Sequence, residues 1–319
     1  MLYGTVPGLT DRVSRLILGS VAFSTLPVKE VQALLDAWVA AGGTAVESAH
    51  HYGRGQAESR IGRWLRRRHV PEGILIITKG AHHDVKSRVR RVTPMAITED
   101  LEHSLERLGV DVVDLFILHR DDPDVPVGPI VECLNEHLAA GRIRAFGGSN
   151  WTHDRLEEAN AYAAARGLRG FVISSSNLAL AVPKEPIWHE VLSIAGDQAA
   201  LSWHRRTQMP LMPWSSQARG FFAGPFAPDD PRTPEIARVY DGENNWERRR
   251  RATEVARRHG CTPTQVALAW VLHQPFPTFP LIGPRAVDEL RDCLGALEVR
   301  LSPDELRWLN LEEPVGPAS

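Results

Sequence analysis

Short apolar runs recur along the chain at intervals that suit strands separated by helices. Each run is continuous rather than alternating, which is typical of strands that are buried on both faces. Gly, Pro or polar residues bound the runs on both sides. The eight runs lie at residues 15–19, 44–47, 74–79, 113–119, 143–149, 171–175, 210–214 and 279–283.

Segments with a helical period of hydrophobic residues lie between the runs, and several of them end in Gly, a common helix stop. Examples are residues 31–43, 95–109, 131–142 and 155–167. Alternating strands and helices predict an α/β fold with a parallel sheet. Eight such units in a row predict closure into a single (β/α)8 TIM-barrel domain over residues 1–319. An open, doubly wound sheet is the alternative, because the runs are short.

Two further segments carry expectations of their own. Residues 221–245 follow the seventh run and show no clear period. An irregular loop of that length in a compact domain is usually functional or mobile. The four consecutive arginines at residues 248–251 are predicted to be a solvated helix face.

Composition excludes several classes of protein. Hydrophobic residues make up 43% of the chain and charged residues 24%, and the net charge is −2, which favours no nucleic-acid partner. No apolar run reaches the roughly 18 residues that span a membrane, and the N-terminal segment lacks the pattern of a signal peptide. The three cysteines, Cys133, Cys261 and Cys293, are few and widely separated. They predict plain thiols in a reducing compartment, and hence a soluble cytoplasmic protein.

Reactive side chains stand where three successive strands are predicted to end. The second run ends in Glu47 with Tyr52 in the loop that follows, the third ends in Lys79, and the fourth ends in His119. Each residue alone would ordinarily be structural or solvated. Because barrel active sites are built at the C-terminal ends of the strands, their convergence indicates one site.

The chemistry of these four side chains suits a proton transfer. A tyrosine titrates near 10 in the absence of perturbation, and a nearby ammonium lowers that pKa. A carboxylate can hold the ammonium in place, and a histidine can orient a carbonyl oxygen beside the phenol. Such a site would protonate an oxygen while a hydride reaches carbon, and the hydride must come from a cofactor.

At these residues the chain resembles the aldo-keto reductases, NAD(P)H-dependent (β/α)8-barrel oxidoreductases. The resemblance runs nearly end to end, through SRLILGSVAF, GGTAVESAHHYGRGQAESRIGRWL, TKGAHHD, DLFILHRDDP, GRIRAFGGSNW, WSSQARGFF and PLIGPRAVDELRDCL. It implies a catalytic tetrad of Asp, Tyr, Lys and His, matched here by Glu47, Tyr52, Lys79 and His119. Tyr52 would be the general acid, Lys79 would lower its pKa, Glu47 would pair with Lys79, and His119 would position the substrate carbonyl.

Glu47 departs from the aspartate of the family pattern. An extra methylene moves a carboxylate by roughly 1.5 Å, which matters where catalytic geometry is tight. We expect Glu47 to reach Lys79 with a different rotamer. The alternative is that it pushes the lysine off line and weakens Tyr52.

The resemblance also implies where a nicotinamide cofactor binds. Ser149 and Asn150 would hold the carboxamide, and Ser175 stands where the family often has a glutamine for the same contact. Trp214 would stack on the nicotinamide ring. The phosphates would contact hydroxyl and backbone N–H groups of Ser215, Ser216, Gln217, Ala218 and Gly220.

The adenosine end of the cofactor would lie before the last predicted helix of the barrel. Gly283 and Arg285 match the site of the 2′-phosphate, for which a guanidinium is well suited. Glu289 and Asp292 stand nearby and would oppose a phosphate. On balance the sequence favours NADP(H) over NAD(H).

The substrate pocket is predicted from the loops after the strands. Polar and aromatic walls favour a sugar-like or polyol-like carbonyl. A metal held by His50 and His51 together with His82 and His83 is not expected, because sequence adjacency does not give tetrahedral geometry and the family needs no metal. The predicted wall residues are Phe23, His50, His51, Arg120, Trp151 and Arg219.

The sequence thus predicts an NAD(P)H-dependent reductase of small-molecule aldehydes or ketones, including sugar-derived ones. Neither a nucleic-acid nor a membrane partner is expected, and no feature indicates an oligomeric state. The alternative is a catalytically weak cofactor-binding regulatory or scaffold protein, like the potassium-channel β-subunit branch of the superfamily. It would keep Ser149, Asn150 and Trp214 for binding while tolerating loss at Glu47. A panel of carbonyl compounds offered with NADPH separates the two.

Overall fold

A parallel sheet of seven strands forms most of a barrel wall in the computed structural model, which describes residues 1–9, 12–67, 73–224 and 234–312. The strands follow the order β8-β7-β6-β5-β4-β3-β9 around the wall. They are β3 (Ile17–Gly19), β4 (Ala45–Glu47), β5 (Leu75–Gly80), β6 (Val113–Leu118), β7 (Ile143–Ser149), β8 (Ser174–Ser175) and β9 (Leu281–Ile282).

Residues 210–213 close the wall between β8 and β9. Leu211 forms parallel bridges to both Ser174 and Thr278. The backbone N–H of Met212 donates to the carbonyl oxygen of Ser174 at 2.8 Å, and that of Phe279 donates to Leu211 at 2.7 Å. Since β9 also pairs with β3, the ring is complete. The predicted barrel is confirmed, and the open-sheet alternative is wrong.

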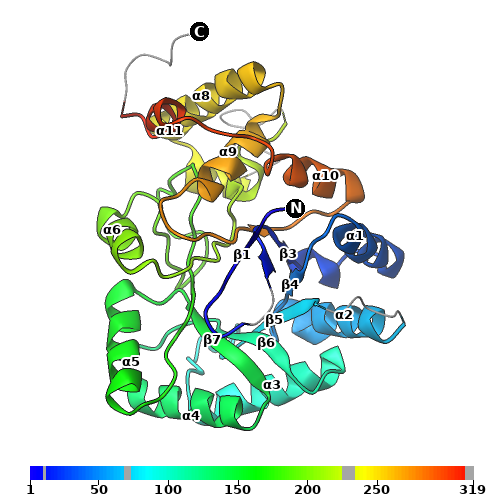
Figure 1. The fold of residues 1–319 in the computed structure, drawn as a ribbon, viewed down its shortest axis with the longest axis vertical. Coiled ribbons are helices and arrows are strands. Elements are labelled where there is room, and N and C mark those ends of the chain that lie inside the picture. Colours follow the sequence, from blue (N-terminus) through cyan, green and yellow to red (C-terminus); the bar gives the residue numbers. More distant parts are fainter. Residues whose placement is uncertain (10–11, 68–72, 225–233, 313–319) are drawn as a thin grey trace.

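Helices surround the strands (Figure 1). The first six alternate with strands or follow them: α1 (Val28–Ala40), α2 (Gln56–Arg67), α3 (Pro94–Leu108), α4 (Val127–Ala139), α5 (His153–Ala165) and α6 (Gln198–Thr207). The others are α7 (Pro234–Tyr240), α8 (Glu243–His259), α9 (Pro263–Leu272), α10 (Val287–Gly295) and α11 (Pro303–Leu309). Local signals set several ends. In α3, Thr93 caps the first turn and Gly109 stops the helix in the left-handed conformation, with φ of 69°.

Alternate residues of each strand face two different cores, which explains the continuous apolar runs. Ile77 and Leu115 point into the barrel, whereas their neighbours Ile76 and Phe116 pack beneath the helices. Burial of one such side chain stabilises the fold by about 1.5–3 kcal/mol. A polar residue in either register would therefore be costly, except at the strand ends.

Two expectations need correction. Residues 225–233 lie outside the described part of the predicted 221–245 loop, but α7 and the start of α8 occupy much of what remains. The arginine run 248–251 is not uniformly solvated. Arg251 is only 8% exposed, lies 3.7 Å over the Trp308 ring and donates to the Trp308 carbonyl oxygen at 2.8 Å.

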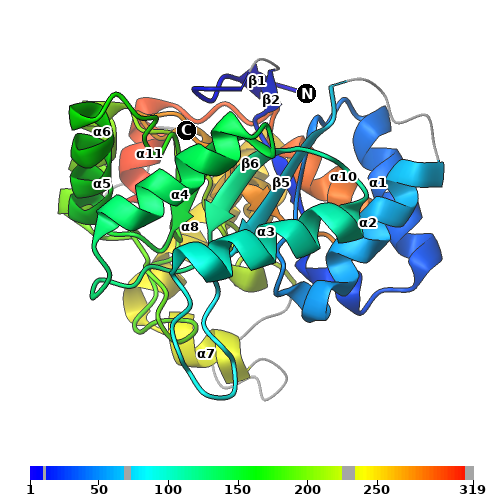
Figure 2. The ribbon, with the colours of Figure 1, turned by 90° about the horizontal axis from the view of Figure 1, so that it is seen from below.

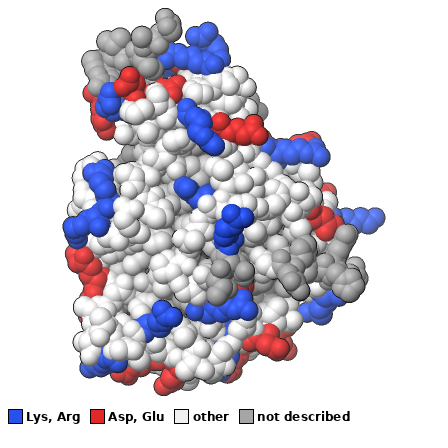
Figure 3. Space-filling view, in the orientation of Figure 1, with Lys and Arg blue, Asp and Glu red and all other residues white. Residues whose placement is uncertain are grey.

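The two ends of the barrel differ. The hairpin of β1 (Tyr3–Gly4) and β2 (Val13–Ser14) covers one end, and the loop after β5 and helix α7 project from the other (Figure 2). Figure 3 shows the hairpin end, where basic and acidic side chains of the described residues are interspersed. Among the described helices, none combines the length and apolar character needed to cross a bilayer.

Candidate active site

The strand ends bring the four predicted reactive residues to the barrel end opposite the hairpin. Glu47 is the last residue of β4, Lys79 is the penultimate residue of β5, and His119 directly follows β6. Tyr52 begins the short 3-10 helix η2 (Tyr52–Gly55) in the loop after β4. Parallel pairing aligns these ends, because Glu47 stands opposite Ile77 on β5 and Lys79 opposite Ile117 on β6.

Three of the four side chains are in direct contact. The Lys79 ammonium donates to the Tyr52 hydroxyl oxygen at 3.0 Å and to the Ser48 carbonyl oxygen at 3.2 Å. The Glu47 carboxylate forms an ion pair with Lys79. The Tyr52 hydroxyl lies 3.4 Å from Oε1 of Glu47. Glu47 and Lys79 are 1% and 2% exposed, so the pair is shielded from water.

The glutamate side chain lies beside Gly19 of the neighbouring strand β3. A Cβ atom at Gly19 would lie 3.4 Å from Oε2 of Glu47, which is an ordinary van der Waals distance. The longer side chain reaches Lys79, which keeps its contact with Tyr52.

Burial sets the protonation of the site. It raises the pKa of Tyr52 to about 12, while the Arg120 guanidinium acts in the opposite direction. Burial, with Arg120 as a second cause, lowers the pKa of Lys79, and the Glu47 carboxylate paired with it favours the charged ammonium. The resemblance implied that Lys79 lowers the pKa of Tyr52, whereas in the structure the net shift is upward and the charge that opposes it is that of Arg120. Tyr52 keeps its proton at neutral pH, as a proton donor must.

His119 presents a neutral imidazole to the site. Its ring meets that of Tyr52 edge-on, with 5.7 Å between centroids. Burial, followed by the charges of Lys79 and Arg120, holds the pKa of His119 well below its usual range. Its Nδ1 atom is buried and has no hydrogen-bond partner among the described residues. Such a ring can orient a carbonyl oxygen but does not compete with Tyr52 as a cationic acid.

Further imidazoles extend from His119 along the rim. His51 stacks on His82 at 4.1 Å, and His82 meets His119 edge-on at 4.7 Å. Burial, with Arg120 as a second cause, lowers the pKa of His82 to about 3. The sequence predictions name His82 only as a possible metal ligand and do not place it beside the tetrad. Its place three residues after Lys79, on the same loop, was the available signal.

The other predicted wall residues differ in how far they can contact a ligand. Phe23 is fully buried in the core and presents no surface to a ligand, which corrects the prediction. Trp151 is 1% exposed and donates its indole N–H to the Arg120 carbonyl oxygen at 3.1 Å, so it supports Arg120. Arg219 is exposed and pairs with Glu235 at 2.6 Å. His50 is half-buried, and its ring lies 3.3 Å from a guanidinium nitrogen of Arg107.

The predicted carboxamide-binding residues form one hydrogen-bonded group beside His119. Ser149 donates to the Ser175 carbonyl oxygen at 2.7 Å, and Ser175 donates to the Met212 carbonyl oxygen at 2.8 Å. The Asn150 amide donates to the His119 carbonyl oxygen at 3.1 Å, with the Asn150 backbone left-handed at φ of 63°. Both serine hydroxyls thus donate their protons to backbone carbonyl oxygens of the barrel wall.

The segment after the seventh wall strand has an unusual backbone. Ser215, Ala218, Arg219 and Gly220 all have positive φ, between 48° and 92°. Non-glycine residues in this region are strained by about 1–3 kcal/mol each and cluster at ligand sites. Successive N–H groups in such turns can form an anion-binding concavity.

Space and an unused donor accompany this backbone. Trp214 is half-buried, and its indole N–H has no partner among the described residues. A Cβ atom added at Gly220 or Gly283 would meet nothing within 4 Å. Gln217 reaches helix α10, with Nε2 at 3.3 Å from Cys293 Sγ. The Trp214 ring, the backbone N–H groups of residues 215–220 and the open space fit a dinucleotide that lies between this segment and α10.

The carboxylates of Glu289 and Asp292, near Arg285, both accept hydrogen bonds within the protein. Glu289 accepts a hydrogen bond from the Arg285 backbone N–H at 2.7 Å. Asp292 accepts from Gln265 at 3.0 Å and from Thr262 at 3.1 Å, so it is turned toward α9. The Arg285 side chain is exposed. Asp292 therefore opposes a phosphate at Arg285 less than the sequence suggested.

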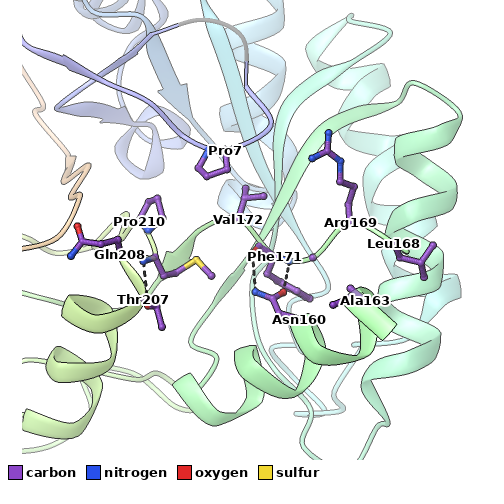
Figure 4. Close-up of a pocket in the computed structure, with 13 residues that line it drawn as sticks. Pro7, Asn160, Ala163, Leu168, Arg169, Phe171, Val172, Thr207, Gln208 and Pro210 are labelled. Atoms are coloured by element: carbon purple, nitrogen blue, oxygen red, sulfur yellow. Dashed lines mark hydrogen bonds between the residues drawn. The ribbon is translucent and has the colours of Figure 1, made fainter. Parts of the chain in front are cut away.

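A hollow of about 370 Å³ lies away from the tetrad, beside Pro7 of the hairpin connection (Figure 4). Its polar groups are partly satisfied, because the Asn160 amide bonds the backbone of Phe171 at 2.7 and 3.1 Å. None of the tetrad residues lines it. The hairpin end of such barrels serves stability rather than catalysis, so we place no substrate there.

Comparison with known proteins agrees with this geometry. The Aldo/keto reductase family model matches residues 15–310. The chain belongs to this family. This membership makes it an oxidoreductase of the barrel type and supports the order of motifs along the sequence.

Individual relatives are similar over nearly the whole chain. An uncharacterized oxidoreductase, YrpG of Bacillus subtilis, is 29% identical over 313 residues, which cover 94% of this chain and 92% of the relative. The aldo-keto reductase yakc [NADP(+)] of Schizosaccharomyces pombe is 28% identical over 281 residues, with 85% and 78% covered. The structure of the glycerol dehydrogenase AKR11B4 from Gluconobacter oxydans superposes with a TM-score of 0.77 at 22% identity, covering 99% and 98%. This last likeness shows the fold.

Proposed function

We propose that the protein is an NAD(P)H-dependent reductase that converts an aldehyde or ketone to an alcohol. The observation that carries the proposal is the contact of the Tyr52 hydroxyl with the Lys79 ammonium at 3.0 Å, with the Glu47 carboxylate paired to the same lysine. Family membership supports an oxidoreductase, and the tetrad supports the direction of proton transfer.

In this mechanism the chain's own residues handle the proton and the carbonyl. The nicotinamide supplies the hydride when it is bound. His119 donates a hydrogen bond that orients the carbonyl oxygen toward Tyr52. Tyr52 transfers its hydroxyl proton to that oxygen as negative charge develops there, and the Lys79 ammonium stabilises the phenolate that remains. Glu47 keeps the ammonium in place.

NADP(H) is the proposed cofactor, in preference to NAD(H). The exposed Arg285 guanidinium would contact the 2′-phosphate, and the engagement of Asp292 with α9 reduces the opposing charge. The printed name of one relative, yakc, includes NADP(+). Ser149, Asn150, Ser175 and Trp214 would bind the nicotinamide end.

The proposed substrates are small carbonyl compounds, including sugar-derived ones, taken from the cytoplasm. The rim beside the tetrad offers Arg120 and the imidazoles of His51 and His82, which suit hydroxyl-bearing molecules. We propose no role for a nucleic acid or a membrane. The three cysteines are free thiols, in keeping with a reducing compartment.

Replacing Tyr52 with Phe tests the proposal. We expect kcat on any accepted aldehyde or ketone to fall by about 10²- to 10⁴-fold, the usual contribution of a general acid. Binding of NADPH, followed by its fluorescence, should stay near the wild-type value. Tyr162→Phe is the matched control, since Tyr162 lies on α5 and bonds Glu132 at the surface. Near-wild-type turnover by the Tyr52 variant would rule out the proposed acid.

A further inference from the structure

Three possible metal ligands meet beyond the imidazoles of the rim. They are His83 from the loop after β5, and His189 and Glu190 from the loop after β8. One ligand atom from each residue can be chosen so that all three lie within 4.8 Å of one another. Only His83 belongs to the set of four histidines that the sequence raised, and His189 and Glu190 are new to it. They do not belong to the tetrad.

Two of the candidate ligand atoms have no hydrogen-bond partner. Nδ1 of His83 and Oε2 of Glu190 lie 3.3 Å apart, and each is buried without a hydrogen bond to any described residue. His83 is only 6% exposed. The two atoms are within ion-pair distance of each other, and Oε2 also lies 3.8 Å from Nδ1 of His189. A cation bound among the three atoms would bind all of them, where the structure shows no hydrogen bond for the first two.

The carboxylate is held as a metal ligand would be. The Glu190 backbone is left-handed, with φ of 53°, a strained conformation that clusters at ligand sites. Arg90 donates to Oε1 of Glu190 at 3.0 Å, which leaves Oε2 directed to His83. The same guanidinium bonds Asp122 at 3.0 Å and Asp124 at 3.1 Å. Supporting contacts of this kind orient metal ligands in known sites.

We propose that His83, His189 and Glu190 form a binding site for a divalent transition-metal ion, with Zn²⁺ as the best fit. Two imidazoles and one carboxylate, completed by water, are an established ligand set for zinc. The charges of Arg88 and Arg120 act on His83 and oppose a cation. The carboxylate of Glu190 acts on His83 in the opposite direction.

Such an ion would link two loops that flank the substrate side of the barrel. His83 contacts His82, with ring centroids 4.2 Å apart, and His82 contacts His119. The ion would therefore fix the rim of the site without touching the reacting atoms. The site does not depend on the proposed reductase function, and its test needs no activity measurement.

The experiment is a titration of the metal-stripped, full-length protein with Co²⁺ and Zn²⁺. The Co²⁺ visible spectrum and Zn²⁺ calorimetry should report one saturable equivalent. His83→Ala, His189→Ala and Glu190→Gln should each weaken binding at least tenfold, since even supporting residues of metal sites contribute 10- to 100-fold. His153→Ala is the control, because His153 lies 3.4 Å from Asp154 but has no third ligand in its described surroundings.

Thermal unfolding provides a second readout. Zn²⁺ should raise the Tm of the wild type in a concentration-dependent way and leave the Tm of the three variants unchanged. The His189 side chain is 54% exposed, so its removal should not disturb folding. Absence of saturable binding by the wild type would overturn the proposal. Wild-type affinity in all three variants would also overturn it and would place the metal elsewhere, for example on His50, His51 and His82.

Discussion

Glu47 stands where the resemblance implies an aspartate, and we propose that the site has adapted to the longer side chain. Its carboxylate lies beside Gly19 and pairs with Lys79. Glu47→Asp should therefore leave a gap between carboxylate and ammonium. Because small misplacements in a catalytic site can cost 10²-fold, we expect kcat to fall by about 10- to 100-fold.

The control for this prediction is Glu47→Gln, which keeps the length of the side chain and removes its charge. It should lower kcat through loss of the ion pair with Lys79, while binding of NADPH is retained. A higher kcat for Glu47→Asp than for the wild type would mean that the glutamate weakens the chemistry.

Arg285 is the residue that we propose selects NADP(H) over NAD(H). Arg285→Ala should weaken NADPH binding by about 10- to 150-fold, the effect of losing a charge-assisted contact of about 1.5–3 kcal/mol. NADH binding should change little. Arg291→Ala on α10, the helix that follows Arg285, is the control, because Arg291 is exposed and pairs with Asp288 at 2.7 Å. Equal weakening of both cofactors would contradict the assignment.

At the scale of elements, the contact between α2 and α3 supports the active-site loops. Gly62 of α2 lies against the backbone of α3, where an added Cβ would be 2.3 Å from the Arg107 carbonyl oxygen and 2.6 Å from that of Leu108. Helix α3 also carries Asp100, whose carboxylate accepts from the Ala81 N–H at 2.8 Å, two residues after Lys79. The spacing of the two helices therefore bears on the tetrad.

Gly62→Ala tests this contact. The two helices must separate, since backbone atoms cannot yield, and we expect a loss of about 1–3 kcal/mol in the free energy of unfolding. Arg63→Ala, an exposed position on the same helix, should change it by less than about 0.5 kcal/mol. Urea unfolding of the three proteins measures both values. A variant as stable as the wild type would show that the interface is not tightly packed.

At the scale of the whole molecule, buried histidines should make the fold sensitive to acid. Burial lowers the pKa of His204 on α6 to about 4. Its unfolded value is about 6.5. Because the folded pKa is depressed, the associated stability is present above about pH 6.5 and is lost as the pH falls toward 4. His82, with a pKa lowered to about 3, acts in the same direction.

Unfolding at pH 7 and pH 5 checks this expectation. The wild type should be less stable at pH 5, with His204 alone contributing up to about 2 kcal/mol. His204→Asn should reduce the difference between the two pH values, since Asn takes up no proton. His153→Asn, at a partly exposed position, is the control. An unchanged pH dependence in the His204 variant would show that other groups carry it.

The sequence by itself determined the barrel and the residues at its strand ends. Continuous apolar runs identified strands buried on both faces, and the stop at Gly109 followed from local backbone chemistry. Glu47, Tyr52, Lys79 and His119 could be found because strand ends in a parallel barrel share one rim. These features depend on residues close together in the chain, or on a topology that repeats.

Only the tertiary structure decided contacts between loops, because the length and composition of a loop do not fix its path. It placed Gly19 under Glu47, turned Asp292 toward α9 and buried Phe23 in the core. It also brought His83 to Glu190, from loops that follow different strands. Protonation was likewise a tertiary matter, since the pKa of Tyr52 depends on its burial and on the charge of Arg120, which a list of residues does not contain.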